Sequence, residues 1–202
     1  MGPHHFVLKR LHSLTGILPI GFYLVEHFFV NSYATRGPEA FNRAAGFMQG
    51  LPYLLALEIV VLYLPILYHG VYGLFITYGG SSNAEAYGSF RNWMYLLQRA
   101  SGVIVFAFIG FHVWNTRLSA VLAGAEVNFR WMAGALSDPW VFAFYVVGVI
   151  AAVFHFANGL WSFLITWGIT PGRRAQGLAA AACGVIFVAL SYVGVDILFA
   201  FV

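Results

Sequence analysis

The sequence contains very little charge. Of its 202 residues, 8% are charged and 61% are hydrophobic, and the mean hydropathy is +0.80. A soluble domain carries about 25% charged residues, so this chain lacks the polar surface that water requires. We therefore expect its solvent to be lipid. The formal charge of +3 comes from scattered basic residues without any run, which argues against nucleic-acid binding.

Cysteine is almost absent as well, since Cys183 is the single one. This excludes an internal disulfide, a four-thiolate iron–sulfur cluster and covalent haem attachment through a C-x-x-C-H motif. Any redox group in this chain would therefore be held without a covalent bond and by ligands other than thiolates.

Long apolar runs take up nearly the whole chain. A membrane-spanning helix needs about 20 apolar residues. We expect five such helices, at residues 13–30, 53–78, 93–122, 140–167 and 175–201. Residues 1–202 are thus predicted to form one transmembrane domain, with no separate soluble domain. The first run is too long and too rich in polar residues for a signal peptide, and we expect it to be retained as a helix.

Basic residues near the helix ends favour one orientation. Those on the side of the N-terminus are Lys9, Arg10, Arg91, Arg99, Arg173 and Arg174. Those on the opposite side are Arg36, Arg43, Arg117 and Arg130. The positive-inside rule then predicts a cytoplasmic N-terminus and an external C-terminus.

The second and fourth runs look like copies of each other. YHGVYGL (68–74) and FHFANGL (154–160) both read aromatic, His, three residues, Gly, Leu. The first and third runs share a weaker pattern of basic residue, Ser, Gly, His and Asn: Arg10, Ser13, Gly16, His27, Asn31 against Arg99, Ser101, Gly102, His112, Asn115. This internal repeat predicts an all-α membrane protein, a four-helix bundle with a peripheral fifth helix.

Four histidines lie inside the predicted spans, where ionisable groups are costly and usually functional. Counted from Pro52 and Pro139, which open the second and fourth helices, His69 and His155 lie roughly 24–26 Å below the outer end. His27 and His112 lie roughly 5–6 Å from the outer ends of the first and third helices. The count therefore pairs His69 with His155 in the inner half of the membrane, and His27 with His112 in the outer half.

Two histidines that face each other at one depth suit the two axial positions of a haem iron. A single intramembrane histidine is more often a packing or hydrogen-bonding residue. Four of them on four helices, matched in depth two by two, favour ligation instead. We predict two non-covalent haems b, an outer one at His27 and His112 and an inner one at His69 and His155. Zinc is disfavoured, because its sites usually gather three or four ligands at one depth.

Small residues lie on the same helix faces as these histidines. Gly73 and Gly159 follow the inner histidines by one turn, and we expect them to leave space for a macrocycle. Gly16 and Gly102 precede the outer histidines by about three turns. They should therefore flank the inner haem.

Other polar residues are weaker candidates. Glu58 lies about three turns before His69, near the predicted outer haem, where it would pass protons to a quinone or simply meet interfacial water. Candidates for binding the propionates of the inner haem are Arg10, Ser13, Arg99 and Ser101, since arginine suits carboxylates; interface anchoring is the alternative for them. His12 is a candidate for the same propionates or for an inner quinone site.

Five motifs extend over essentially the whole chain: RLHSLTGILP (10–19), LPILYHGVYGL (64–74), QRASG (98–102), FHVWN (111–115) and VFHFANGLW (153–161). In order and spacing they resemble the membrane-anchor cytochrome b subunit of succinate dehydrogenase (succinate:quinone oxidoreductase). The resemblance is closest to the five-helix, two-haem anchors of bacteria that use menaquinone. In that family the axial histidines lie on the first four helices, which corresponds here to His27, His69, His112 and His155.

The resemblance implies two soluble partners on the cytoplasmic side of a bacterial cytoplasmic membrane. A flavoprotein with covalent FAD would oxidise succinate, and an iron–sulfur subunit would deliver the electrons. This chain would have no succinate-oxidising site and would be the quinone-reactive subunit of the complex. Electrons would reach the inner haem, cross to the outer haem and reduce menaquinone near the outer face.

Three alternatives stay open from the residues themselves. The same anchor could serve a fumarate reductase, which runs the reaction in reverse. A two-haem quinone-reactive subunit of another membrane oxidoreductase, such as a hydrogenase or formate dehydrogenase, would differ in its electron donor. A haem-free structural anchor or small transporter would lack the alpha band of a b-type cytochrome.

Overall fold

The computed structural model describes residues 3–202, and within them the chain forms helices and no strand. Five helical segments are long and apolar enough to cross a membrane: His4–Arg36, Leu54–Tyr78, Phe90–Leu122, Pro139–Thr166 and Arg173–Phe199. This confirms the predicted all-α membrane fold with five spans. The first segment starts before residue 13, because the strong helix formers around Lys9 and Arg10 extend it.

Prolines and wide turns interrupt the first three spans. The first consists of α1 (Pro3–Ile17) and α2 (Pro19–Asn31), which separate at Leu18 because Pro19 has no N–H to donate. The second consists of α4 (Leu54–Leu57), the π-helical segment η2 (Glu58–Tyr63) and α5 (Leu64–Tyr78). The third consists of α6 (Phe90–Val113), the π-helical segment η3 (Trp114–Leu118) and α7 (Ser119–Leu122).

The last two spans are the uninterrupted helices α9 (Pro139–Thr166) and α10 (Arg173–Phe199). Pro139 is the first residue of α9, and the Asp138 carboxylate accepts hydrogen bonds from the backbone N–H groups of Trp140 and Val141 at 2.7 and 3.2 Å. The prediction that Pro52 opens the second helix is wrong, because α4 begins at Leu54. Pro52 lies in a turn ahead of α4, and Tyr53 takes a left-handed backbone conformation with φ 57°.

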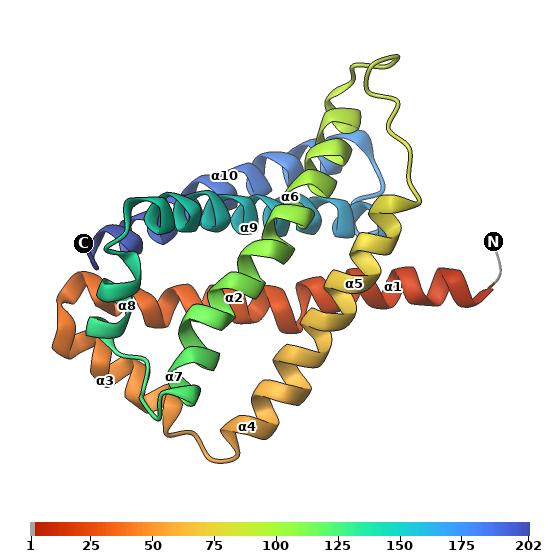
Figure 1. Cartoon of the computed structure of the whole chain (residues 1–202). Helices are drawn as coiled ribbons and strands as arrows, with labels where there is room; N and C mark the ends of the chain where they lie inside the picture. Colours follow the sequence, from red (N-terminus) through yellow and green to blue (C-terminus); the bar gives the residue numbers. More distant parts are fainter. Residues whose placement is uncertain (1–2) are drawn as a thin grey trace.

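Helix α9 is the central helix of the fold, since it packs against α1, α6 and α10. Helix α10 runs alongside α9, as Figure 1 shows, and is the peripheral fifth helix. Helix α5 contacts α1 and α6. The first four spans thus contact one another in a ring.

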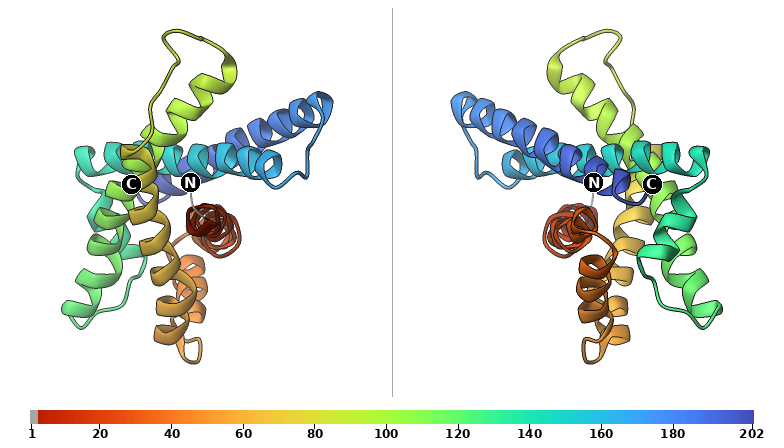
Figure 2. Two further views of the ribbon diagram at one scale, coloured as in Figure 1. Left: turned by 90° about the vertical axis from the view of Figure 1, so that its right-hand side faces the viewer. Right: turned by 90° about the vertical axis from the view of Figure 1, so that its left-hand side faces the viewer.

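These helices cross at wide angles. Figures 1 and 2 show α5 and α6 sloping across α1, α2 and the α9–α10 pair. Glycines allow backbones to approach closely where helices cross. Gly148 of α9 lies against the ring of Phe108 on α6, and Gly70 of α5 lies against the ring of Phe106 on the same helix.

The connections between the first and second spans and between the third and fourth spans contain helices that the apolar runs did not predict. The short segment η1 (Ser32–Arg36) leads into α3 (Pro38–Gln49), and α8 (Phe129–Leu136) precedes α9. The Asn42 side-chain oxygen accepts a hydrogen bond from the backbone N–H of Phe129 at 2.8 Å, which joins α3 to α8. Phe41, Met132, Leu136 and Phe201 are buried there, so this end of the molecule is closely packed.

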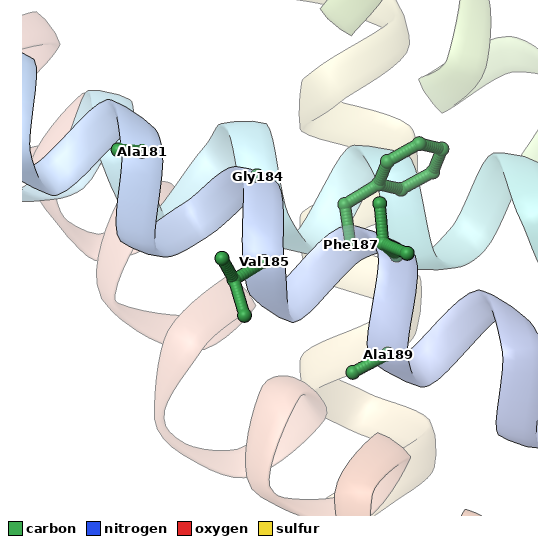
Figure 3. A pocket seen from close by; sticks show the side chains of 6 residues that line it. Ala181, Gly184, Val185, Phe187 and Ala189 are labelled. Atoms are coloured by element: carbon green, nitrogen blue, oxygen red, sulfur yellow. The ribbon is translucent and has the colours of Figure 1, made fainter.

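Much of the remaining surface is apolar and exposed, as lipid contact requires. The second span has no buried residue in α4, η2 or α5. A shallow hollow on the flank of α10, shown in Figure 3, is lined only by Ala181, Gly184, Val185, Phe187, Val188 and Ala189. It contains no group that could bind a metal or transfer a proton, and it fits a lipid-facing surface.

Candidate functional site

The structure brings the four histidines together in two pairs. In the pair predicted for the inner half of the membrane, here called the inner pair, His69 of α5 faces His155 of α9, with ring centres 6.1 Å apart and ring planes at 89°. In the pair predicted for the outer half, here called the outer pair, His27 of α2 faces His112 of α6, with ring centres 5.8 Å apart and ring planes at 85°. The members of each pair come from different spans. These are the same pairs that the depth count produced.

The spacing of the rings fits one metal ion between the members of each pair. A metal–nitrogen bond is about 2 Å long, and the ring centre lies about 1 Å behind the nitrogen. Two imidazoles on opposite sides of one metal therefore have centres about 6 Å apart. Both observed separations agree with this value, so each pair fits a metal ion, such as a haem iron, that two histidines would hold.

Hydrogen bonds orient the rings of the inner pair. Nδ1 of His69 lies 2.9 Å from the backbone oxygen of His12, and Nδ1 of His155 lies 3.1 Å from that of Gln98. Metal-binding histidines usually donate their second ring N–H to such a group. Among the described residues these bonds occupy Nδ1 of both rings and leave Nε2 free for a metal.

The outer pair contains an orphaned polar atom. Nδ1 of His112 is buried and has no hydrogen-bond partner among the described residues. The ring lies between Phe108 and Tyr145, with ring centres at 5.8 and 5.7 Å. An unpaired buried polar group costs about 1–3 kcal/mol. His112 therefore lacks the hydrogen bond at Nδ1 that orients each inner ring.

All four predicted glycines, Gly16, Gly73, Gly102 and Gly159, lie near the inner pair. Two of them contact the histidine rings directly. A Cβ added at Gly16 would come within 2.5 Å of Cε1 of His69, and one at Gly102 within 2.9 Å of Cε1 of His155. These two glycines therefore leave room for the imidazole rings themselves.

Gly73 and Gly159 border side chains of the neighbouring helix. A Cβ at Gly73 would lie 3.1 Å from Nε2 of His12, and one at Gly159 would lie 3.2 Å from Nε2 of Gln98. Gly73 thus faces His12 and Gly159 faces Gln98, and their role in leaving space for a macrocycle stays a prediction.

His12 and Ser101 belong to the inner pair. The His12 ring stacks on His69, with centres 4.1 Å apart and planes at 7°. Ser101 is buried, with 7% of its surface exposed, and its hydroxyl lies 3.3 Å from Nδ1 of His155.

The other three propionate candidates, Arg10, Ser13 and Arg99, contact other groups of the protein. The Arg10 guanidinium donates to the backbone oxygen of Thr166 and lies over the ring of Trp167. The Trp167 indole N–H donates to the Ser13 hydroxyl at 3.3 Å. Arg99 lies over the ring of Tyr95, 3.9 Å from its centre. Their propionate role stays a prediction.

Glu58 forms an ion pair that the sequence reading missed. Its carboxylate accepts a hydrogen bond from Arg117 at 2.9 Å, and the side chains of Glu58 and Arg117 are 18% and 33% exposed. The two residues lie in η2 and η3, the two π-helical segments, and such segments are frequent at functional sites. The sequence could have indicated this pair, because Glu58 and Arg117 carry opposite charges at similar depths in two apolar runs.

A polar network beside His155 was missed as well. The Gln98 side chain donates to the backbone oxygen of His155 at 3.0 Å and accepts from Asn158 at 2.7 Å. Asn158, which is buried, also donates to the backbone oxygen of Met94 at 3.1 Å. Gln98 lies in the motif QRASG and Asn158 in VFHFANGLW. An amide side chain in an apolar run was the sequence feature that could have indicated this network.

The fold and these pairs define a class, that of polytopic helical membrane proteins with paired histidines in the core. Residues 81–193 match the family described as succinate dehydrogenase/fumarate reductase transmembrane subunit. Over 201 residues, 100% of this chain and 99% of the relative, the sequence is 51% identical to the succinate dehydrogenase cytochrome b558 subunit of Bacillus subtilis (strain 168). The chain belongs to this family of transmembrane subunits, which confirms the resemblance found in the motifs.

Proposed function

We propose that this chain is the cytochrome b membrane anchor of a succinate dehydrogenase and that it holds two haems b. The observation that carries the haem assignment is the pairing of histidines from four spans at iron-compatible spacing. The relative's name, which contains cytochrome b558, supports a haem protein. In this proposal His27 and His112 ligate the outer iron, and His69 and His155 ligate the inner iron.

Bound at these two depths, the haems would supply one-electron carriers across the bilayer. The residues of this chain hold them and provide the surroundings. At the inner pair, backbone oxygens fix the orientation of the imidazoles, and His12 stacks on one of them. Arg10, Ser13, Arg99 and Ser101 remain the candidates for the propionates.

Glu58 is the proposed proton donor to a quinone, menaquinone, reduced near the outer face. A carboxylate inside a span is costly, and Arg117 stabilises it by a direct ion pair. The pair brings a proton carrier and a hydrogen-bond donor together, as reduction of a quinone requires. The chain is thus the quinone-reactive subunit of its complex.

The partners follow from the family. A flavoprotein with FAD oxidises succinate, and an iron–sulfur subunit passes the electrons to this anchor; the proposal places both on the cytoplasmic side of a bacterial cytoplasmic membrane. The N-terminus is then cytoplasmic and the C-terminus external. A fumarate reductase anchor is the second candidate, because the family description includes that enzyme.

Purification of the complex from detergent-solubilised membranes tests the proposal. We expect a flavoprotein and an iron–sulfur subunit to co-purify, and the chain to carry two haems b that succinate reduces. A purified chain without a b-type alpha band after dithionite reduction would refute the haem assignment. Two haems with a different donor subunit would instead place the anchor in another oxidoreductase.

A further inference from the structure

The first and third spans correspond residue by residue around the inner pair. His12, Thr15 and Gly16 of the first span match Gln98, Ser101 and Gly102 of the third, and the sequence pattern showed only the glycines of this set. The Thr15 hydroxyl donates to the backbone oxygen of His12 at 3.0 Å, and the Ser101 hydroxyl donates to that of Gln98 at 3.0 Å. Gly16 and Gly102 follow directly after these hydroxyl residues.

Each of these backbone oxygens also binds an inner histidine. A carbonyl oxygen can only accept hydrogen bonds, so the ring nitrogen that faces it must be an N–H. This assigns the proton of His69 to Nδ1, at 2.9 Å from the oxygen of His12, and that oxygen therefore serves two donors, a hydroxyl and an imidazole. Nδ1 of His155 lies 3.1 Å from the oxygen of Gln98, and also 3.2 Å from the Gln98 amide nitrogen and 3.3 Å from the Ser101 hydroxyl.

In both spans the glycine allows the imidazole ring to come close to the backbone. The Cβ that any other residue would carry at position 16 or 102 would touch Cε1 of the facing imidazole, at 2.5 and 2.9 Å. Carbonyl, hydroxyl and glycine thus act on the same ring, and together they set its orientation.

We propose that residues 12, 15 and 16, and residues 98, 101 and 102, form two equivalent carbonyl clamps for the inner haem ligands, in which Thr15 and Ser101 are positioning residues. The inference rests on the proposed function. Each hydroxyl competes with the imidazole for its carbonyl oxygen and so weakens the bond from Nδ1–H. Without the hydroxyl that bond is stronger, the imidazole is more basic, and the ferric iron is favoured.

The outer pair lacks this arrangement. The side chains four residues after the outer histidines, Asn31 and Thr116, donate to the backbone oxygens of His27 and His112, at 2.7 Å in both cases. Neither of these oxygens binds a ring nitrogen among the described residues, and Nδ1 of His112 has no partner there. Loss of a hydroxyl should therefore change the reduction potential of the inner haem when it occurs at Thr15, and should leave that potential unchanged when it occurs at Thr116.

Thr15→Val in the whole complex tests the clamp by redox titration of the haem absorbance, with the inner haem identified as the one lost in His69→Leu. We expect the inner haem to become harder to reduce by about three- to tenfold in its equilibrium constant, the worth of one hydrogen bond, with the outer haem unchanged. Thr15→Ser, which keeps the hydroxyl, should retain the wild-type potential, and Thr116→Val should leave the inner haem unaffected.

An unchanged inner potential in Thr15→Val, or an equal shift in Thr116→Val, would overturn the clamp. If Thr15→Val does not assemble, Thr15→Ala removes the same hydroxyl with a smaller side chain, and absence of a shift there has the same meaning. Wild-type complex without two b-type haems would overturn the proposed function itself, and the clamp with it.

Discussion

At the scale of single residues, each histidine of a pair is expected to be essential for one haem only. In His112→Leu the outer haem would lose one of the two histidines proposed to hold it, while the inner pair stays intact. We expect roughly half of the haem content to remain, measured as pyridine haemochrome in the purified complex. His4→Leu, an exposed position outside both pairs, is the matched control and should retain both haems. Full haem content in His112→Leu would exclude it as a ligand.

Replacement of Glu58 by glutamine distinguishes a role in proton transfer from a structural role. Glu58→Gln keeps the size of the side chain and removes the proton carrier, so quinone reduction should slow by about tenfold or more while the haem spectrum is preserved. Glu39→Gln is the control, because the Glu39 carboxylate is 93% exposed and pairs only loosely with Arg43 at 3.8 Å. Loss of haem in Glu58→Gln would show that the ion pair with Arg117 has a structural role instead.

At the scale of elements, glycine has different roles in different helices. Gly16 of α1 lies against the His69 ring, whereas a Cβ added at Gly184 of α10 would meet nothing within 4 Å. Gly16→Ala should therefore displace His69 and lower the content of the inner haem. Gly184→Ala should keep both haems and stabilise its helix by roughly 0.5–1 kcal/mol. Haem content and thermal unfolding of the complex measure both effects, and a fully loaded Gly16→Ala complex would contradict the close contact.

The π-helical segments explain why two charges meet inside the membrane. Pro65 has no N–H to donate at the start of α5, and the wide turn of η2 precedes it. The turn of η3 follows His112 on the facing span. These local distortions bring Glu58 and Arg117 to hydrogen-bonding distance, which regular helices counted at 3.6 residues per turn did not reveal.

At the scale of the whole molecule, the two histidine pairs make the proposed reaction sensitive to the membrane potential. Electrons that move from a negative cytoplasmic side to an external quinone gain about 2.3 kcal/mol per charge per 100 mV. Since menaquinone has a low potential, an uncoupler should slow its reduction by succinate in sealed vesicles. Vesicles made leaky beforehand serve as the control, and equal rates with and without uncoupler in sealed vesicles would rule out the coupling.

Much of the fold was predictable because lipid places a simple demand on sequence. Every span must be apolar over about 20 residues, and the five runs therefore stood out at residue level. The helices α3 and α8 did not stand out, because they are short and lie in connections whose polar residues resemble a loop. They are stabilised by burying Phe41 and Met132 against other parts of the chain, which is a tertiary effect.

The candidate site was predictable to the level of the histidines. Helical rise converts residue number into depth, so His69 and His155, and likewise His27 and His112, were paired by counting alone. The neighbours of these rings were not predictable in the same way. Gln98 and Asn158 act through hydrogen bonds between spans, and the repeat of hydroxyl and glycine was hidden because its common element is a backbone oxygen.

The sequence by itself determined the solvent, the number of spans and the depth of each histidine, since all three depend on composition and on distance along one helix. Only the tertiary structure decided which groups surround each ring, because those contacts join helices far apart in the chain. It placed His12 on His69, Arg117 on Glu58 and two backbone oxygens against Nδ1 of the inner ligands. Crossing angle and rotation of the helices set these contacts, and neither follows from the apolar pattern of a single span.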